Sequence, residues 1–375
     1  MKLIIAGGGT GGHLFPGIAV AEEFLAREPA NEVLFVGTER GIEAQAVPAA
    51  GYRLELISAA GIRGKGSLGK FKGTMMMLYG YAQSRKILKE FQPDLVLGVG
   101  GYASLPMVLA ARGMQIPHFI HEQNAIPGMT NKLLSRIVDR VFITLDESAK
   151  YFPEEKILLT GNPLRRQILE NRDRGPGNGD QDKADFTGSG SPVPAPHFRL
   201  FVFGGSQGAH AINMAMVAAL PLLKDMGKEV EITHQTGVSD HAEVAAAYRA
   251  AGVDARVVPF IDNMAEEYSR ADLLVCRAGA TTIAELTACG KPAIFIPFPH
   301  AVDDHQRRNA EALLKKDAGF MLLEQELSGE RLASLIKELL TDPELLRETG
   351  QRAFELARLD AARIIVDEML KPQNR

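Results

Sequence analysis

The stretch "LIIAGGGTGGHLFPG", residues 3–17, decides how the chain begins to fold. Its apolar start predicts a buried strand, its glycines predict a tight turn, and the residues from His13 onward predict a helix. A strand that ends in glycines and leads into a helix lets backbone N–H groups approach a phosphate, because no side chain stands in the way. This turn therefore indicates an α/β unit of the nucleotide-binding kind.

The glycine spacing alone leaves a second interpretation open. The glycines of this turn satisfy the G-x-G-x-x-G spacing of dinucleotide sites, which should also place a carboxylate after the second strand. Glu39 lies close behind the predicted second strand, residues 33–36, and keeps a nicotinamide-dependent oxidoreductase among the alternatives. That interpretation does not account for His13 at the start of the helix.

The composition is that of an ordinary globular protein with room for two domains. The chain has 375 residues, of which 46% are hydrophobic and 23% charged, and its formal net charge of -4 gives no reason to expect a nucleic-acid partner. Cys276 and Cys289 predict no disulfide framework, which fits a reducing cytoplasm. The opening apolar run is too short for a signal-peptide core, and no apolar run reaches the roughly 18 residues of a membrane span.

Alternating strand and helix patterns predict two doubly wound parallel sheets. Short β-branched and aliphatic runs alternate with helical patterns in both halves, which is typical of buried parallel strands. The predicted strands are residues 3–6, 33–36, 53–57, 95–99, 118–121, 141–145 and 157–160, followed by 200–203, 230–233, 255–259, 273–276, 293–296 and 319–323. Residues 171–197 lose all periodicity and are rich in Gly, Pro, Ser and Asp, as expected of a flexible insertion.

This pattern predicts two Rossmann-like α/β domains with a cleft between them. We expect an N-terminal domain over residues 1–165, a linker over 166–197 and a C-terminal domain over 198–342. The amphipathic helical segment 343–375 is expected to return to the first domain.

Ligands of open parallel sheets bind beyond the carboxyl ends of the strands, so the residues that follow strands are the candidates for a site. In the first half, "HEQN" at 121–124 offers consecutive hydrogen-bonding side chains, although a solvated turn has the same composition. "GNPLR" at 161–165 follows the last predicted strand of that half, and its arginine favours an anionic ligand.

Three loops of the second half carry similar signals. In "FVFGGSQGAHAIN", residues 201–213, Ser206 can cap the next helix, or the glycine turn around it can bind a phosphate. In "CRAGATTIAELTACGKP", residues 276–292, Thr282 and Glu285 have capping-box spacing, and the alternative for Glu285 is a carboxylate that binds a ribose diol. The loop "PFPHAVDDHQRRNA", residues 297–310, is dense in polar groups that could hold hydroxyls or begin the next helix.

Motifs for two other chemistries are missing from the sequence. It contains no G-x-x-x-x-G-K-[ST] run and no Cys/His metal spacing, which disfavours a P-loop enzyme and a zinc site. Asp180 and Asp182 form a D-x-D pair, but they lie in the low-complexity insertion, and we interpret the pair as chance.

The segment "GIRGKGSLGKFKGTMMMLYGYAQSRKILK", residues 61–89, contains no Asp or Glu. A basic, apolar helix can rest in an anionic lipid interface, whereas a methionine-rich stripe is also common in protein cores. The residues expected at the lipid are Lys65, Lys70, Lys72, Met75, Met76, Leu78, Tyr79 and Arg85.

The motifs "GGGTGGH", "HEQN", "GNPLR", "GGSQGA" and "GATTIAE" occur in this order over nearly the whole chain. Together they resemble the peptidoglycan N-acetylglucosaminyltransferases of glycosyltransferase family 28, which convert lipid I to lipid II. The resemblance implies the GT-B fold and an inverting transfer of N-acetylglucosamine from UDP-N-acetylglucosamine to the C4 hydroxyl of MurNAc in undecaprenyl-pyrophosphoryl-MurNAc-pentapeptide. It implies no cofactor, because the sugar nucleotide is a substrate. It also implies that no metal ion is required.

The resemblance also implies a place in the cell and partners. The enzyme would lie peripherally on the cytoplasmic face of the bacterial inner membrane. It would meet UDP-N-acetylglucosamine, lipid I, an anionic membrane surface and other cell-wall synthesis enzymes there, and no nucleic acid.

The same resemblance assigns roles to single residues. It implies that His13 is the general base and that His13, His121 and Glu122 face the acceptor. A histidine whose ordinary pKa is about 6.5 suits proton removal from a hydroxyl near neutral pH. Charge on the departing UDP would be stabilised by helix N-termini, Ser206 and Arg165, which predicts chemistry without a metal ion.

The implied donor site spans both halves of the chain. Ser206 would hold the diphosphate, Glu285 the ribose and Ile261 the edge of the uracil, while Asn124 and Gln306 would contact the sugar. The full implied set is Thr10, Gly11, Gly12, Asn124, Arg165, Ser206, Ile261, Ala280, Thr281, Thr282, Glu285 and Gln306. Besides the oxidoreductase, the alternatives are a GT-B transferase with another acceptor and a sugar-nucleotide binding protein without activity.

Overall fold

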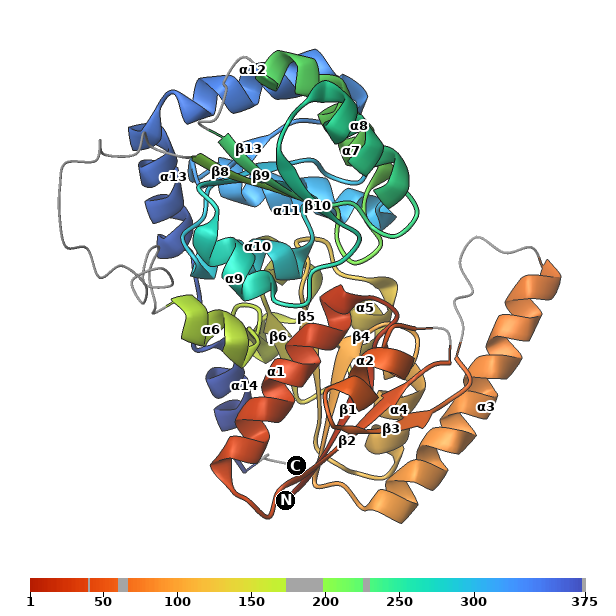
Figure 1. The fold of residues 1–375 in the computed structure, drawn as a ribbon. Helices are drawn as coiled ribbons and strands as arrows, with labels where there is room; N and C mark the ends of the chain where they lie inside the picture. Colours follow the sequence, from red (N-terminus) through yellow and green to blue (C-terminus); the bar gives the residue numbers. More distant parts are fainter. Residues whose placement is uncertain (40, 60–66, 173–197, 225–229, 373–375) are drawn as a thin grey trace. The chain divides into compact units, whose positions relative to one another are not determined.

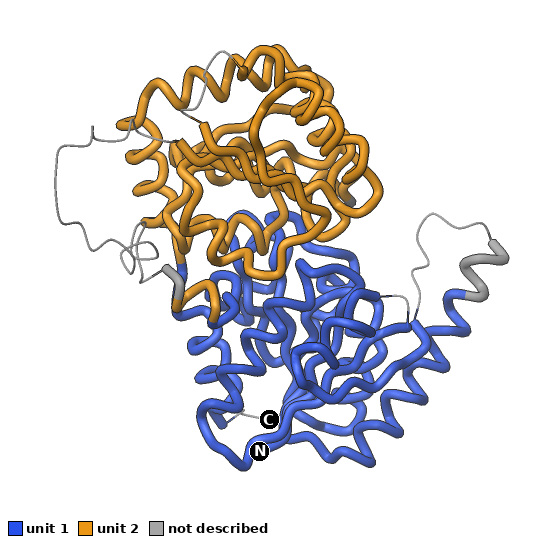
Figure 2. The backbone as a smooth tube through the Cα atoms, viewed as in Figure 1, with its two compact units in different colours: residues 1–166, 358–375 blue, residues 167–357 orange. Residues whose placement is uncertain are grey.

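The computed structural model describes residues 1–39, 41–59, 67–172, 198–224 and 230–372 (Figure 1). Lys65 and the Asp180 and Asp182 pair lie outside these residues, as does most of the predicted linker. The chain divides into two compact units (Figure 2): unit 1 comprises Met1–Arg166 and Arg358–Arg375, and unit 2 comprises Gln167–Ala357.

Among the described residues, unit 1 contains a seven-stranded parallel sheet in the order β3-β2-β1-β4-β5-β6-β7. Its strands are β1 (Lys2–Gly7), β2 (Glu32–Gly37), β3 (Arg53–Leu56), β4 (Leu95–Gly100), β5 (His118–Glu122), β6 (Arg140–Ile143) and β7 (Ile157–Leu159). Its helices are α1 (Gly11–Arg27), α2 (Glu43–Ala49), α3 (Ser67–Phe91), α4 (Ser104–Gly113), α5 (Met129–Leu134) and α14 (Ala361–Met369).

The strands of unit 1 are apolar on both faces because helices cover both. Leu3 and Ile5 of β1 pack with α1, α2 and α14, whereas Ile4 and Ala6 pack with α3, α4 and α5 on the other face. Alternation of side chains along a strand divides one buried run between two cores in this way.

Unit 2 repeats the plan with a six-stranded parallel sheet in the order β10-β9-β8-β11-β12-β13, counted over its described residues. Its strands are β8 (Phe198–Phe203), β9 (Val230–Gln235), β10 (Ala255–Val258), β11 (Leu273–Cys276), β12 (Ala293–Phe295) and β13 (Phe320–Met321). Its helices are α6 (Arg166–Arg172, all but its first residue), α7 (His210–Leu223), α8 (His241–Ala251), α9 (Met264–Arg270), α10 (Ala280–Ala288), α11 (His305–Leu314), α12 (Gly329–Leu340) and α13 (Pro343–Glu355).

The fold confirms the predicted class of two parallel α/β units, and every predicted strand is present with its ends within two residues of the expected positions. In both sheets the strand order reverses beside the first strand, between β1 and β4 and between β8 and β11. Crevices at such switch points are where doubly wound sheets bind ligands. No helix in the described part of the chain is long and apolar enough to span a membrane.

The helical segment after residue 342 is divided between the units. α13 belongs to unit 2, whereas the chain from Arg358 onward belongs to unit 1. There α14 packs on α1, with Ile365 and Val366 fully buried and Arg27 2.8 Å from Asp367.

Candidate active site

The switch point of unit 1 brings two glycine turns together. Gly8 N–H donates to Gly100 O over 3.3 Å, so the turn after β1 lies on the turn after β4. The buried hydroxyl of Ser104 donates to Ala6 O at 2.6 Å and accepts from Gly100 N at 3.0 Å. The two strand ends are therefore fixed to each other by hydrogen bonds.

His13 lies in the first turn of α1, next to the turn that follows β4. Its Nδ1 is 3.3 Å from the hydroxyl of Thr10, the N-cap residue, whose side chain caps no backbone N–H. The imidazole lies so close to Gly100 that a Cβ there would overlap the ring. Gly11 and Gly12 complete the same helix turn, so four of the predicted site residues lie together.

A carboxylate that the sequence analysis did not single out lies inside the first glycine turn. Glu43 is 1% exposed and accepts a hydrogen bond from Gly9 N at 2.7 Å. Its other oxygen accepts from the backbone N–H and the hydroxyl of Thr38. A turn that was expected to face a phosphate thus holds an acidic side chain of the protein.

The "HEQN" loop is organised from within by Glu122. This carboxylate, 2% exposed, accepts hydrogen bonds from the backbone N–H groups of Asn124 and Gly128 and from the side chain of Asn131 at 2.9 Å. Burial raises the pKa of Glu122, and these hydrogen bonds oppose that shift. Asn124 itself is half-buried, and its amide nitrogen lies 3.3 Å from Glu122.

His121 is also buried, and its two ring nitrogens have partners. Gln123 Nε2 donates to Nδ1 at 3.0 Å, so Nε2 carries the proton and faces Gly161 O at 3.2 Å. Burial lowers the pKa of His121 to about 4, so the ring is neutral near neutral pH. Because His121 and Glu122 are turned into the protein, their side chains shape the loop. The expectation that this loop faces the acceptor stays a prediction.

Arg165 of the "GNPLR" motif lies beside α1. Its guanidinium is 4.5 Å from the ring centre of Phe15, which is two residues beyond His13. This stacking holds a positive charge near the first turn of α1.

In unit 2, the turn after β8 is exposed at the switch point. Ser206 is exposed, and α7 begins only at His210 with Ala209 as its N-cap and no side-chain cap. The expectation that Ser206 could cap this helix is therefore wrong, because the helix starts too late. Gly205 has a φ of 92° and open space where a Cβ would stand. A side chain is excluded there by the left-handed backbone, not by crowding.

The start of the helix after β11 contradicts the predicted capping box as well. α10 begins at Ala280 with Gly279 as N-cap, so Thr282 lies inside the first turn together with Thr281 and caps nothing. Glu285 is 4% exposed and accepts a hydrogen bond from the Tyr268 hydroxyl at 3.0 Å. The carboxylate is thus contacted by a neighbouring helix, α9.

The loop between β12 and α11 completes this edge of unit 2. Gln306 Oε1 accepts from Phe298 N at 3.0 Å, which fixes the orientation of the side-chain amide. Asp303 and Asp304 both have left-handed backbone, with φ of 53° and 55°, a strained conformation that is often found at functional sites. Ile261, which follows β10, is buried in the core that contains Tyr268.

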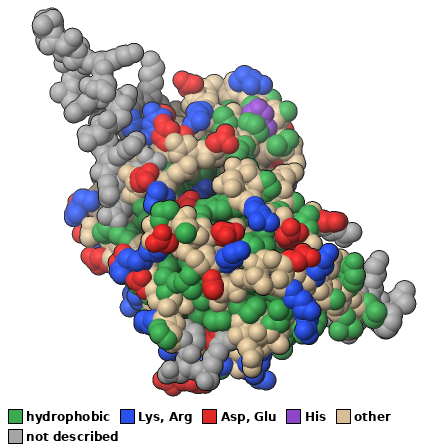
Figure 3. All heavy atoms as spheres, turned by 90° about the horizontal axis from the view of Figure 1, so that it is seen from below, with side chains coloured by type: hydrophobic (Ala, Val, Ile, Leu, Met, Phe, Trp, Pro, Cys, Tyr) green, Lys and Arg blue, Asp and Glu red, His purple; other side chains and the backbone are tan. Residues whose placement is uncertain are grey.

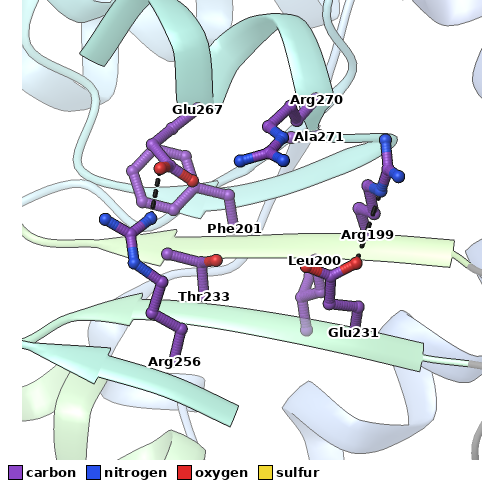
Figure 4. Close-up of a pocket in the computed structure, with 9 residues that line it drawn as sticks. All are labelled: Arg199, Leu200, Phe201, Glu231, Thr233, Arg256, Glu267, Arg270 and Ala271. Carbon is purple, nitrogen blue, oxygen red and sulfur yellow. Dashed lines mark hydrogen bonds and ion pairs between the residues drawn. The ribbon is translucent and has the colours of Figure 1, made fainter. Parts of the chain in front are cut away.

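A separate groove of unit 2 lies over the beginning and the middle of strands β8, β9 and β10 (Figure 4). Together with α9 and the residue that follows it, these strands contribute its lining residues: Arg199, Leu200, Phe201, Glu231, Thr233, Arg256, Glu267, Arg270 and Ala271. Arg199 pairs with Glu231, and Arg256 pairs with Glu267. Because its charges are paired within the protein and none of the predicted site residues lines it, we assign this groove no part in the reaction.

Three residues of the site could not be found from the sequence: Glu43, Asn131 and Tyr268. Each lies in a helix and hydrogen-bonds to a group outside that helix, and no motif spacing marks it. Over the described residues, no cluster of three or more His, Cys, Asp or Glu side chains is arranged to hold a metal ion.

Comparison with known proteins identifies the class. Family models match at residues 3–143 (glycosyltransferase family 28 N-terminal domain) and at residues 199–365 (glycosyltransferase family 28 C-terminal domain). Over 99% of both chains the structure resembles a crystal structure of Acinetobacter baumannii MurG, with a TM-score of 0.76 and 31% identity. The UDP-GlcNAc 2-epimerase of Neisseria meningitidis, 14% identical with a TM-score of 0.68, shares the fold alone. The fold and the two matching family models together define a glycosyltransferase of the GT-B class.

The curated relatives narrow the class to one family. Proteins named UDP-N-acetylglucosamine--N-acetylmuramyl-(pentapeptide) pyrophosphoryl-undecaprenol N-acetylglucosamine transferase are 72% identical in Pelobacter propionicus and 64% identical in Geobacter metallireducens, over 100% of both chains in each case. The chain belongs to this family of N-acetylglucosamine transferases. The oxidoreductase alternative is therefore wrong.

Proposed function

We propose that the two units have different roles in the reaction that this enzyme family catalyses. The enzyme transfers N-acetylglucosamine from UDP-N-acetylglucosamine to lipid I and so forms lipid II. In our proposal unit 2 holds most of the donor, and unit 1 activates the C4 hydroxyl of the MurNAc acceptor.

The exposed turn at Gly205 and Ser206 is the observation that carries the donor assignment. It lies at the switch point of unit 2, where backbone N–H groups of a glycine turn favour a diphosphate. The corresponding turn of unit 1 already holds the carboxylate of Glu43. We therefore place the donor diphosphate on the Ser206 turn.

The rest of the donor follows the carboxyl edge of unit 2. Glu285 binds the ribose diol as a hydrogen-bond acceptor, Ile261 borders the uracil, and Gln306 presents its amide to the sugar hydroxyls. The proposed donor contacts otherwise comprise Thr10, Gly11, Gly12, Asn124, Arg165, Ala280, Thr281 and Thr282.

His13 is the general base of the proposed mechanism. It removes the proton from the acceptor hydroxyl as that oxygen attacks the anomeric carbon from the face opposite UDP, which inverts the configuration. His121 is a poor candidate because its pKa is lowered to about 4 and its nitrogens are engaged inside the protein. Negative charge on the leaving UDP is stabilised by the turn at Ser206, the start of α10 and Arg165, without a metal ion.

The exposed face of α3 is our candidate for contact with the membrane that carries the acceptor. Met75, Leu78 and Tyr79 are 51%, 60% and 61% exposed and share one helix face through their i, i+3 and i+4 spacing. Arg85 continues this face two turns further along and is exposed, as are its basic neighbours Lys86 and Lys89. The right-hand edge of Figure 3, where α3 lies, shows hydrophobic and basic side chains next to each other.

Such a face suits an anionic lipid surface, because apolar side chains enter the interface while basic ones meet the headgroups. Met76 is half-buried and contributes less than predicted. The side chains of Lys70 and Lys72 lie outside the described part of the structure. We propose a peripheral location on the cytoplasmic face of the bacterial inner membrane, where lipid I presents its sugar.

The experiment that tests this proposal is a radiolabel-transfer assay with UDP-N-acetylglucosamine and a short-chain lipid I analogue, run with and without EDTA and with UDP-glucose in parallel. We expect transfer of the N-acetylated sugar that EDTA leaves unchanged. Loss of transfer in EDTA, restored by a divalent cation, would disprove the metal-independent step. Donor binding without transfer would overturn the acceptor assignment.

A further inference from the structure

Glu43 lies where a Rossmann-type turn would otherwise hold a phosphate. Its carboxylate accepts from Gly9 N at 2.7 Å and from Thr38 N at 2.9 Å, so one side chain joins the turns that follow β1 and β2. Backbone N–H groups at such turns bind anions. In this protein the anion at the turn is the carboxylate of Glu43 itself.

Glycines make room for this carboxylate from three positions. A Cβ on Gly8, Gly37 or Gly41 would overlap the side chain of Glu43. Within the glycine-rich turn that first suggested a ligand phosphate, Gly8 is therefore explained by a buried protein side chain.

Two routes of contact lead from Glu43 to the imidazole of His13. Along the chain, Gly9 precedes Thr10, whose hydroxyl is 3.3 Å from His13 Nδ1. Through space, Gly8 hydrogen-bonds to Gly100, and the ring of His13 lies directly against Gly100. A shift of the first glycine turn would move both supports of the ring.

We propose that Glu43 is a positioning residue for His13: its carboxylate substitutes for a bound anion in the first glycine turn and holds Thr10 and the imidazole in place for proton removal. This inference rests on the proposed role of His13 as general base. Glu43 is buried and is none of the proposed donor contacts, so its loss should lower turnover more than it weakens donor binding.

The first test compares Glu43→Gln with Glu39→Gln, a control in the same segment whose side chain is exposed. An amide keeps the shape of the carboxylate but cannot accept from Gly9 and Thr38 at the same time, because one of its ends is a donor. We expect Glu43→Gln to lower kcat about tenfold or more and to change the KM for UDP-N-acetylglucosamine by a smaller factor, because Thr10 is only one of the proposed donor contacts. Glu39→Gln should keep wild-type kcat. Unchanged kcat in Glu43→Gln would overturn the proposal.

The second test is chemical rescue of Glu43→Ala. This substitution removes a group the size of acetate, so acetate should refill the site and raise kcat several-fold, whereas acetamide and chloride at the same concentration should not. A general loss of folding would not respond to the shape and charge of the added anion. If acetate failed to rescue a Glu43→Ala protein that folds and binds the donor, the proposal that the Glu43 carboxylate takes the place of a bound anion would be contradicted.

A third measurement separates this inference from the proposed function. The imidazole signals of the histidines can be followed by NMR, with the His13 signal assigned by its absence in His13→Asn. We expect Glu43→Gln to shift the His13 signal and to leave that of the exposed His300 in place. If His13→Ala retained full turnover, the base assignment would fail, yet a shifted His13 signal would still support positioning by Glu43. An unshifted signal would refute positioning even if His13 proved to be the base.

Discussion

His13 illustrates how a catalytic assignment depends on neighbours that lie far away in the sequence. Thr10 and Gly100 support its ring, and the buried, neutral His121 nearby leaves His13 as the better candidate for proton removal at this switch point. The neighbours matter because a general base must lie within hydrogen-bond reach of the proton that it removes.

The substitution His13→Ala should lower kcat by about 10²- to 10⁴-fold, the usual contribution of general base catalysis. Donor affinity should change little, since most of the proposed donor contacts lie in unit 2. Steady-state transfer kinetics and calorimetric titration with UDP-N-acetylglucosamine check the two parts separately. A variant with normal turnover would remove His13 from the mechanism.

Tyr268 offers a second test at the scale of one residue. Its hydroxyl donates to Glu285, so Tyr268→Phe should leave the core packing intact and free the carboxylate that is proposed to bind the ribose. We expect the affinity for UDP to fall about tenfold, the effect of losing one hydrogen bond to a charged group. Affinity for 2′,3′-dideoxy-UDP should not change, because it lacks the diol. An equal loss for both nucleotides would instead indicate general damage to unit 2.

At the scale of elements, α3 has a buried face and an exposed apolar face. Ile87, Leu88 and Phe91 pack into the core of unit 1, while Met75, Leu78 and Tyr79 remain exposed. The sequence of this helix did not separate the two faces, because methionines and leucines occur on both.

The triple substitution Met75→Ser, Leu78→Ser and Tyr79→Ser should weaken binding to anionic vesicles at least about tenfold, because each exposed apolar side chain contributes on the order of 1 kcal/mol on insertion. Co-sedimentation with phosphatidylglycerol vesicles measures this, and neutral phosphatidylcholine vesicles should bind weakly to all variants. A matched control replaces the exposed apolar residues Val238 and Leu222 of unit 2 with Ser and should bind like wild type. Equal losses in both variants would contradict a specific α3 surface.

At the scale of the whole molecule, the described residues of each unit include one histidine whose pKa burial lowers enough to keep it neutral. His121 lies in unit 1, and in unit 2 His234 lies between Tyr248 and Asn213, at 3.1 and 3.0 Å. Burial lowers the pKa of both histidines to about 4 from an ordinary value of 6.5. Between these pH values the unfolded chain binds a proton at each position and the folded chain does not, so the free energy of unfolding must fall as the pH falls through this window.

We expect the loss to be about 2 kcal/mol for each histidine between pH 6.5 and pH 5. Urea unfolding followed at several pH values measures it. The variant His234→Gln should show a weaker pH dependence for unit 2, whereas His300→Gln, at an exposed position, should keep the wild-type dependence. A pH dependence that is the same in all three proteins would exclude His234 as a source.

The sequence predicted the sheets well because buried parallel strands are continuous apolar runs bounded by glycine turns, a signal that is local in the chain. It predicted the positions of strand-end residues such as His13, Ser206 and Glu285 for the same reason. It failed at the helix starts near Ser206 and Thr282, where the spacing of capping residues is also met by chance within a helix or a loop.

By itself the sequence determined the fold class, the order of the motifs and the family, since these depend on residues that are neighbours along the chain. Only the tertiary structure decided which side chains face inward. It placed His121 and Glu122 inside their loop, seated Glu43 in the first glycine turn, and joined Tyr268 to Glu285. The physical reason is that these partners come from separate elements, and only folding of the sheet and its helices brings them within hydrogen-bond distance.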